Sequence, residues 1–240
     1  MEHDQNRLKE AAGKAVVDDM VKSGMKLGLG TGSTAIHAVR RVGELLKSGQ
    51  LKDIAAFATS FQTSIECEKL DIPHYSLNSR ELSEGLDLTI DGADEVDPQN
   101  RLIKGGGGAH LIEKIAAYAS KTFAVIVDES KLTDSLGGGF PVPVEVVPEA
   151  RVQVTKALEK LNANVILRDA LRKAGPVITE HGNLILDIHF SCPIDPAAME
   201  TELNNIPGVV ENGFFTGKTP VVYIARSDGR IDIRQGTTFR

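Results

Sequence analysis

The sequence predicts an α/β protein, in which a parallel sheet covered by helices is joined to a smaller antiparallel α+β domain. Short apolar runs of strand length alternate with amphipathic segments of helix length over the first half of the chain, and this order is typical of a parallel sheet with helices on both faces. From about residue 137 the order becomes strand, helix, strand, strand, helix, strand, which is typical of a small antiparallel domain. We therefore expect residues 1–136 together with 212–240 to form the first domain, and residues 137–211 to form the second.

The elements of the first half follow from the spacing of their apolar residues. Helices are predicted where apolar residues recur every three or four positions, and strands where a short apolar run ends in glycine or polar residues. The predicted helices cover residues 8–22, 33–47, 61–70 and 109–120, and the predicted strands cover residues 25–30, 54–59, 86–90 and 122–127. Ser33 or Thr34 is the expected N-cap of the second helix, because a hydroxyl oxygen can accept a hydrogen bond from a free amide of the first turn.

The second half begins at three successive glycines, Gly137–Gly139, followed by a segment rich in proline and valine. We expect a hairpin over residues 178–189, with its turn at His181-Gly182-Asn183, because the residues after the turn alternate between apolar and polar. The other predicted elements of this half are helices at about 149–161 and 196–205 and strands at about 164–168 and 209–210. Two further strands, 220–225 and 231–233, are expected to return to the first domain.

Composition and charge exclude several classes of protein. The 240 residues include 27 Lys and Arg against 33 Asp and Glu, which gives a formal net charge of −6. Because no basic run accompanies this acidic balance, we expect no nucleic-acid partner. No apolar stretch approaches the ~20 residues of a membrane helix, and the N-terminus is too polar for a signal peptide, so we expect no membrane association and a cytoplasmic protein. The two cysteines, Cys67 and Cys192, are expected to be reduced thiols.

Four segments that carry glycine, acidic and basic residues lie after predicted strands or next to a predicted helix. They are residues 28–34 (GLGTGST), 91–97 (DGADEVD), 104–110 (KGGGGAH) and 128–131 (DESK). Ligands of open α/β sheets bind beyond the carboxyl ends of the strands. Glycines let backbone amides approach an anion, and the N-terminus of the following helix favours negative charge. These segments therefore predict a binding site for a small phosphorylated ligand.

Two common nucleotide-binding motifs fit this sequence poorly. Ser33 stands where the dinucleotide fingerprint requires its third glycine, and the strand end at Thr59-Ser60 lacks the acidic residue that binds ribose. Residues 217–219 (GKT) match the end of a P-loop, but Asn212 stands where its first glycine is required. A compact phosphate cradle is the remaining interpretation of the glycine loop at 28–34. No spacing of His, Asp and Glu indicates a metal site.

Ordinary structural roles explain several other residues. Cys67 is expected to pack a helix, while Lys114 and Lys121 are expected to lie on solvated surfaces. Asp97 precedes a proline and is expected to form a turn. His110 adjoins the glycine loop, and a structural role is favoured for it over a catalytic one.

Taken together and in order, these segments resemble ribose-5-phosphate isomerase of the type A family. The similarity extends over nearly the whole chain, and the pairing of DGADE with KGGGGA is highly specific. The matching segments are GLGTGSTA (28–35), ATS (58–60), DGADEVDP (91–98), KGGGGA (104–109), EK (113–114), VDESK (127–131), PVPVEVVP (141–148), GNLILDIHF (182–190) and IPGVVENGFF (206–215). Segments 71–85 and 216–240 carry no usable motif.

The resemblance implies a fold, an activity and a set of partners. The fold is a Rossmann-like domain with a smaller antiparallel α+β (ferredoxin-like) domain, assembled as a homodimer or homotetramer. The activity is the interconversion of D-ribose 5-phosphate and D-ribulose 5-phosphate through an enediolate, in the non-oxidative pentose phosphate pathway. A sugar phosphate is the implied substrate, and neither a cofactor nor a metal is implied.

Position by position, the resemblance also implies roles for individual residues. Glu113 matches the general base, and Lys104, Asp91 and Asp94 match further catalytic groups. The implied substrate-binding residues are Thr31, Gly32, Ser33, Thr34, Asp91, Gly92, Ala93, Asp94, Lys104, Gly105, Gly106, Gly107, Lys131 and, from the N-terminal region, Lys9.

These roles combine into an expected mechanism. Glu113 takes the C2 proton of the open-chain aldose and delivers a proton to C1, while Lys104 and the amides of Gly105–Gly107 stabilise the oxyanion. Asp91 and Asp94 orient hydroxyls, and Asp91 assists ring opening. The phosphate is held by Lys131 and the hydroxyls at 33–34, and this binding positions the reacting carbons.

Two other functions remain as alternatives. A domain that senses sugar phosphates and regulates transcription would need a DNA-binding module, and only about 24 residues precede the first predicted strand. A CoA-dependent transferase of similar architecture would need a covalent glutamate and a CoA site. Glu113 favours catalysis over regulation, and added CoA would raise the thermal stability of a transferase.

Overall fold

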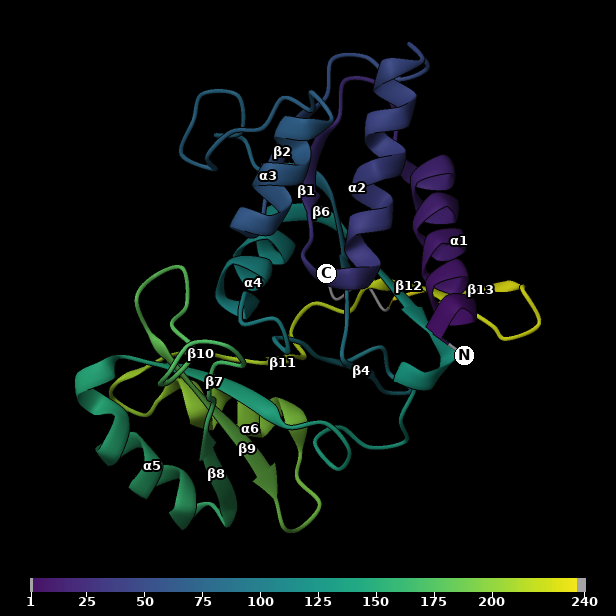
Figure 1. The fold of residues 1–240 in the computed structure, drawn as a ribbon. Helices are drawn as coiled ribbons and strands as arrows, with labels where there is room; N and C mark the ends of the chain where they lie inside the picture. The colour runs from purple at the N-terminus through teal and green to yellow at the C-terminus, as the bar shows by residue number, and fades with distance from the viewer. Residues whose placement is uncertain (1, 237–240) are drawn as a thin grey trace. The chain divides into compact units, whose positions relative to one another are not determined.

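The computed structural model describes residues 2–236, and the chain divides into two compact units (Figure 1). Unit 1 contains the described residues of Met1–Ala93, Ile112–Leu132 and Lys218–Arg240. Unit 2 contains Asp94–Leu111 and Thr133–Gly217.

Unit 1 is built on a six-stranded sheet with the strand order β13-β12-β6-β3-β1-β2. Its strands are β1 (Lys26–Leu29), β2 (Ala55–Ala58), β3 (Leu86–Gly92), β6 (Ser120–Asp128), β12 (Val221–Ala225) and β13 (Ile231–Arg234). Neighbouring strands are parallel except for β13, which pairs antiparallel with β12. The predicted parallel sheet is confirmed, and so is the return of the last two strands to it.

The helices of this part of the chain follow the predicted order. They are α1 (Glu2–Met20), α2 (Gly32–Lys47), α3 (Phe61–Lys69), α4 (His110–Ala119), which belongs to unit 1 from Ile112 onward, and the short 3₁₀ helix η1 (Glu129–Lys131). The apolar core of unit 1 includes Val16 of α1, Val39 of α2, and Leu29, Ile90 and Ile126 of the sheet, all fully buried.

The start of α2 corrects one prediction. The N-cap is Thr31, whose side chain makes no capping hydrogen bond, and not Ser33 or Thr34, which lie inside the first turn. Gly32 has a φ of +99°, a conformation that only glycine adopts without strain. The chain therefore turns into the helix earlier than the hydroxyl residues indicated.

Unit 2 contains a four-stranded antiparallel sheet with the order β10-β7-β9-β8. Its elements are β7 (Val142–Val146), the 3₁₀ helix η2 (Pro148–Ala150), α5 (Arg151–Lys160), β8 (Ala163–Leu167), β9 (Leu184–Phe190), α6 (Pro196–Asn204) and β10 (Val209–Asn212). Asp195 starts α6, because its side chain accepts a hydrogen bond from the amide of Ala197 at 3.0 Å. The predicted strand–helix–strand–strand–helix–strand order is confirmed.

The predicted hairpin over residues 178–189 is only half regular. Its second arm is strand β9, whereas Ile178 of the first arm pairs with Leu184 in an isolated bridge. The turn itself is present, because the amide of Thr179 donates to the carbonyl of Asn183 at 2.9 Å.

Unit 2 contains a second sheet, and because of it the two units divide the chain at other residues than the expected boundaries. The short strands β4 (Glu95–Val96), β5 (Leu102–Ile103) and β11 (Phe214–Phe215) form a three-stranded sheet. This pairing holds residues 94–111 and 212–217 in unit 2, whereas the sequence placed them with the first domain. Strands of two residues have no apolar periodicity, so the sequence carried no signal for them.

The exposure of individual residues tests the structural roles expected for them. Cys67 is fully buried in the core, as predicted, and burial raises the pKa of its thiol to about 12. Lys121 is exposed and pairs with Asp87 at 2.7 Å, which confirms its surface position. Lys114 is buried, so its expected place on a solvated helix face is wrong; a single sequence does not reveal what packs against a helix.

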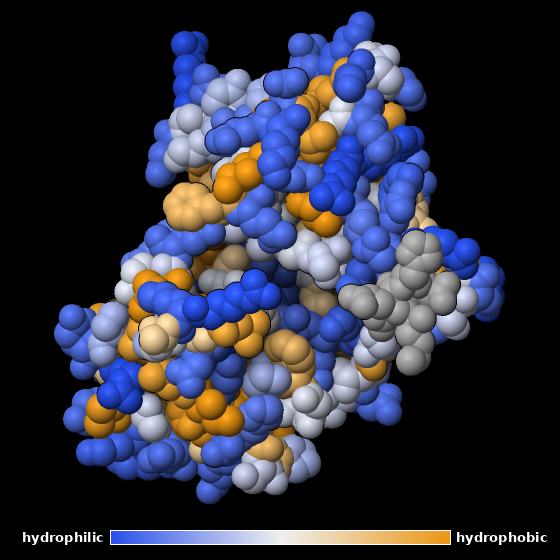
Figure 2. Space-filling model, in the orientation of Figure 1, coloured by the Kyte–Doolittle hydropathy of each residue, from blue (hydrophilic) through white to orange (hydrophobic). Residues whose placement is uncertain are grey.

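On the face drawn in Figure 2, hydrophilic residues are interspersed with apolar ones. Within the described part of the chain, no helix is both long enough and apolar enough to cross a membrane.

Candidate active site

Strands β1 and β3 are neighbours in the sheet of unit 1, with Leu29 opposite Ile90. From β1 the chain continues to β2 on one side, and from β3 it continues to β6 on the other. Ligands of open α/β sheets bind beyond the carboxyl ends of the strands at such a reversal. The predicted loop at 30–34 follows β1, and Asp91 and Gly92 form the carboxyl end of β3, so the structure places them where a ligand is expected.

Asp91 organises the backbone at this point. Its side chain is fully buried, and Oδ1 accepts hydrogen bonds from the amides of Thr31 at 3.1 Å and Gly92 at 2.7 Å. A Cβ atom on Gly30 would lie only 2.1 Å from the same oxygen. Gly30 is therefore required by the position of Asp91, a role that the sequence did not assign to it.

The Thr31 hydroxyl faces other protein groups. Its oxygen lies 2.7 Å from the hydroxyls of both Thr59 and Ser60, and 3.3 Å from that of Thr63. Thr63 in turn donates to the carbonyl of Gly30 at 2.8 Å. The segment that follows β2 thus braces the glycine loop, and Thr31 shapes the loop through both its amide and its hydroxyl.

The N-terminus of α2 provides the setting for an anion. This 16-residue helix has no acidic residue in its first turn, so the partial positive charge of its free amides is not neutralised there. Ser33 is exposed, and its hydroxyl accepts a hydrogen bond from Lys9 Nζ at 3.0 Å. A Cβ on Gly92 would lie 3.7 Å from that of Thr34. The structure therefore brings Lys9, Ser33 and Thr34 to one end of the sheet.

Lys131 is positioned by the turn that follows β6. Strand β6 pairs in parallel with β3, so the carboxyl ends of both strands lie at the same edge of the sheet. The Asp128 side chain accepts a hydrogen bond from the amide of Ser130 at 3.0 Å, which starts the 3₁₀ turn. Glu129 accepts a hydrogen bond from the amide of Ser227 at 3.0 Å, which fixes the turn to the chain after β12. Lys131 is thereby held at the edge of the sheet that carries Asp91.

Glu113 lies in the first turn of α4, and only 5% of it is exposed. The helix is tied to the sheet because the hydroxyl of Thr89, on β3, donates to the carbonyl of Ala116 at 3.0 Å. A carboxyl group that is shielded from water yet carried on a rigid helix is well suited to exchange protons with a bound ligand.

Unit 2 carries the other predicted groups. The Asp94 carboxylate accepts a hydrogen bond from the amide of Gly106 at 2.8 Å, and the amide of Asp94 donates to the carbonyl of Ile103 at 2.8 Å. Lys104 is 3% exposed, and its Nζ lies 5.7 Å from the centroid of the Phe215 ring. The aromatic face favours the charged ammonium in this buried position.

The glycine loop between Lys104 and α4 is a tight turn. The amide of Gly108 donates to the carbonyl of Gly105 at 2.9 Å, and both glycines have positive φ angles. A Cβ on Gly105 would lie 2.7 Å from Nδ1 of His110. His110 is fully buried and supports the loop, in agreement with the structural role favoured for it. Gly106 and Gly107 are exposed.

The structure thus divides the predicted site residues into two groups. Those of unit 1 are Lys9, Thr31, Gly32, Ser33, Thr34, Asp91, Gly92, Ala93, Glu113 and Lys131, and those of unit 2 are Asp94, Lys104, Gly105, Gly106 and Gly107. Among the residues that the structure describes, no group of three or more His, Cys, Asp or Glu is arranged to hold a metal ion.

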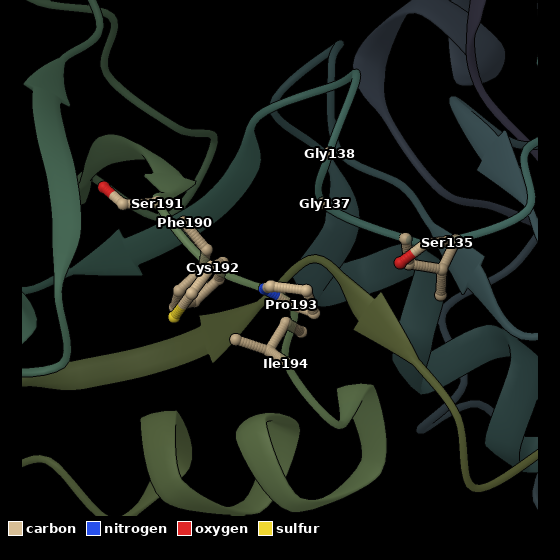
Figure 3. Close-up of a pocket in the computed structure, with 9 residues that line it drawn as sticks. Ser135, Gly137, Gly138, Phe190, Ser191, Cys192, Pro193 and Ile194 are labelled. Atoms are coloured by element: carbon tan, nitrogen blue, oxygen red, sulfur yellow. The ribbon is translucent and has the colours of Figure 1, made fainter.

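A separate cavity in unit 2 does not match the predicted chemistry. It has a volume of about 240 Å³ and is lined by residues 135–138 and 190–194 (Figure 3). The stick view shows Cys192, Pro193 and Ile194 around it, and no charged side chain lines it. None of the predicted site residues belongs to this cavity, and it offers no cation for a phosphate.

The chain is similar to proteins of one known family. Residues 55–229 match the family described as ribose 5-phosphate isomerase A (phosphoriboisomerase A). The chain is 54% identical to ribose-5-phosphate isomerase A of Treponema denticola over 236 residues, which cover 95% of this chain and 99% of the relative.

Solved structures agree with this similarity. A D-ribose-5-phosphate isomerase in complex with phospho-erythronic acid aligns with a TM-score of 0.91 at 41% identity, covering 95% of this chain and 98% of that one. Ribose 5-phosphate isomerase from Plasmodium falciparum aligns with a TM-score of 0.91 at 36% identity, covering 97% of this chain and all of that one.

Proposed function

The chain belongs to the ribose 5-phosphate isomerase A family and interconverts ribose 5-phosphate and ribulose 5-phosphate, and we propose which of its residues carry out each step. One observation carries the proposal. Unit 1 carries a shielded carboxyl, Glu113, and at the reversal point of its sheet a glycine loop lies beside the buried Asp91. Family membership also favours an isomerase over the regulator and the CoA transferase.

The phosphate of the substrate binds at the N-terminus of α2. The free amides of the first turn, the hydroxyls of Ser33 and Thr34, and the ammonium groups of Lys9 and Lys131 supply hydrogen-bond donors and positive charge. The hydrogen bond between Lys9 and Ser33, at 3.0 Å, supports including Lys9 in this group. Binding of the phosphate fixes one end of the sugar and so helps to position its reacting carbons.

Glu113 acts as the base in the chemical step. Its carboxylate takes the proton from C2 of the open-chain aldose, and the electron pair of the broken C–H bond forms the C1–C2 double bond of the enediolate, with negative charge on O1. Glu113 then returns a proton to C1, while O2 becomes the carbonyl oxygen and its proton goes to O1. The atoms of ribose 5-phosphate and ribulose 5-phosphate therefore balance without an external oxidant.

The groups of unit 2 stabilise the intermediate. Lys104 and the amides of Gly105 and Gly107 donate hydrogen bonds to the oxyanion. The amide of Gly106, also expected among these donors, is bonded to Asp94, which in addition orients a hydroxyl. Asp91 orients a second hydroxyl and assists opening of the furanose ring. Removing one donor to an oxyanion raises a barrier by about 2.7–4 kcal/mol, so Lys104→Ala is expected to lower kcat by a factor of about 10²–10³.

Assays of purified variants test these roles. Glu113→Gln keeps the shape of the side chain but removes the base, so conversion of ribose 5-phosphate should be nearly abolished; Glu159→Gln, at an exposed position of α5, is the matched control. Lys131→Ala should raise KM for ribose 5-phosphate while changing the free energy of unfolding little. Near-normal turnover of the Glu113 variant would contradict its role as the base, and an unchanged KM would contradict the phosphate role of Lys131. The wild-type reaction should proceed in the presence of a metal chelator.

We also propose a cytoplasmic homodimer or homotetramer, with no nucleic-acid or membrane partner. Self-association is supported by the large apolar side chains that unit 1 exposes on α3 and α4, where Phe61, Ile65 and Tyr118 are about half exposed or more. Surfaces of this kind are often covered by another chain. Sedimentation equilibrium of the purified protein measures the state directly, and a monomer at micromolar concentration would contradict the proposal.

A further inference from the structure

Arg168 connects the sheet of unit 2 to the glycine loop. It follows β8, and its Nε and Nη2 donate to the two carboxylate oxygens of Asp187 at 2.8 and 2.5 Å. Its Nη1 donates to the carbonyls of Gly105 at 2.9 Å and Gly106 at 3.1 Å. One guanidinium group thus holds two successive carbonyl groups of the loop.

The anchor of this arginine is rigid. Asp187 lies on β9, where it is opposite Ile166 of β8 and Pro143 of β7. Each side chain of the ion pair is only 16% exposed, so solvent screens the pair less than a surface pair. Two parallel hydrogen bonds to one carboxylate also fix the plane of the guanidinium. The sheet therefore determines where the cation lies.

The contacts of Arg168 determine which way the loop amides point. In a trans peptide the C=O and N–H groups point in opposite directions, and the described chain has no cis peptide. With the carbonyls of Gly105 and Gly106 directed at Arg168, the amides of Gly106 and Gly107 point away from it. The amide of Gly106 is taken by Asp94. A Cβ on Gly107 would meet no atom within 4 Å, so the space on that side of the residue is open, and the residue is exposed.

We infer that Arg168 is a positioning residue that holds and polarises the peptides of Gly105–Gly107, so that the amide of Gly107 is presented to the oxyanion of the enediolate. This inference rests on the proposed function, because it specifies how the loop of that site is prepared. Four successive glycines leave the backbone free to adopt many conformations, and a fixed cation restricts that freedom before the substrate binds. Hydrogen bonds to a carbonyl also strengthen the donor on the same peptide group.

Three substitutions test the inference. Arg168→Gln removes the positive charge, and the two hydrogens of its amide nitrogen cannot replace all four hydrogen bonds of the guanidinium. Arg168→Lys keeps the charge, but a single ammonium cannot hold both the carboxylate and the two carbonyls. In Asp187→Asn the arginine remains but loses its charged anchor. Arg41→Gln is the matched control, because Arg41 also joins two carboxylates, those of Asp18 and Glu44, on unit 1.

The measurements are kcat and KM with ribose 5-phosphate, and inhibition constants for phospho-erythronic acid and for inorganic phosphate. Phospho-erythronic acid, which is bound in the solved relative, carries a carboxylate that resembles the oxyanion in charge. For Arg168→Gln we expect kcat to fall by about 30-fold or more, somewhat less than the factor of about 10²–10³ for outright loss of an oxyanion donor, because the amide remains but is no longer held; KM should change less than threefold. Inhibition by phospho-erythronic acid should weaken in proportion to kcat, and inhibition by phosphate should not change. Lysine should recover less than a tenth of the lost activity, and Asp187→Asn should show a smaller loss of the same kind.

Three results would overturn the inference. One is a folded Arg168→Gln enzyme with kcat within threefold of wild type. Another is full recovery of kcat in Arg168→Lys. The third is a loss of kcat that is no larger than the fraction of protein that thermal melts show to be unfolded. A loss of the same size in the Arg41→Gln control would count in the same way. If Lys104→Ala loses activity while Arg168→Gln does not, this inference fails and the proposed roles of Lys104 and Glu113 stand. If Lys104→Ala and Glu113→Gln both retain activity, those proposed roles themselves fail.

Discussion

The close contact between Gly30 and Asp91 leads to a prediction that can be worked out from distances. In Gly30→Ala, the new Cβ would lie 2.1 Å from Oδ1, 2.3 Å from Cγ and 2.6 Å from Cα of Asp91. The side chain could rotate away, but the Cα belongs to strand β3 and cannot, so β1 and β3 must separate locally by about 0.8 Å to reach ordinary contact at 3.4 Å. Overpacking of this kind costs about 1–3 kcal/mol, and loss of one amide hydrogen bond to the carboxylate adds about 1.5–3 kcal/mol.

We therefore expect Gly30→Ala to lower the free energy of unfolding by about 2.5–6 kcal/mol, a large part of the 5–15 kcal/mol typical of a folded protein. Urea denaturation measures this loss, and the isomerase assay should show a lower kcat in the fraction that is folded, because Asp91 has moved. Gly138→Ala is the control: its Cβ would meet only the carbonyl of Ser135 at 3.9 Å, and its stability should change by less than about 1 kcal/mol. A Gly30→Ala protein with wild-type stability and kcat would show that the chain accommodates the methyl group without moving Asp91.

Two further predictions concern ionisable groups. Burial raises the pKa of Cys67 to about 12, while Cys192 is exposed. Iodoacetamide at about pH 8, near the usual thiol pKa, should therefore label one thiol per folded chain, and mass spectrometry should find the label at Cys192. Rapid labelling of Cys67 would contradict its burial. Burial, followed by the charge of Arg40, lowers the pKa of His37 from its usual 6.5, so the folded state favours the neutral ring and stability is lost as the pH falls below that value. The fall in unfolding free energy from about pH 7 to pH 5, the range in which histidine titrates, should be smaller in His37→Gln than in wild type, and an equal fall would show that His37 does not cause it.

The long elements of this fold could be predicted because their signal is local. Apolar spacing alone placed α2 and β3 within one or two residues, and strands β12 and β13 were correctly returned to the first sheet. Strand β11 pairs with β5 across more than a hundred positions of the sequence, and two-residue strands such as β4, β5 and β11 have no apolar pattern. For that reason the division of the chain at residues 94–111 was not predictable.

The predicted site residues lie in recognisable sequence motifs, whereas the residues that hold them in place do not. The sequence drew attention to Asp91 and the glycine loop through unusual runs of acidic residues and glycine. Arg168, by contrast, lies 63 residues from Gly105, and a lone arginine after an ordinary strand gives no sign of the carbonyls it holds. Thr31 shows the opposite case, since a residue in a recognisable motif directs its hydroxyl to Thr59 and Ser60.

If Glu113 moves the proton between C2 and C1, removing its carboxylate must stop both exchange at C2 and isomerisation, and one isotope experiment measures the two together. Ribose 5-phosphate deuterated at C2 is incubated in ordinary water with wild type and with Glu113→Gln, and NMR follows both loss of deuterium from C2 and formation of ribulose 5-phosphate. We predict that wild type is slowed by a primary isotope effect, and that Glu113→Gln loses isomerisation and C2 exchange together, by about 10²–10⁴-fold. Exchange at C2 that continues at the wild-type rate in Glu113→Gln would show that another group is the base.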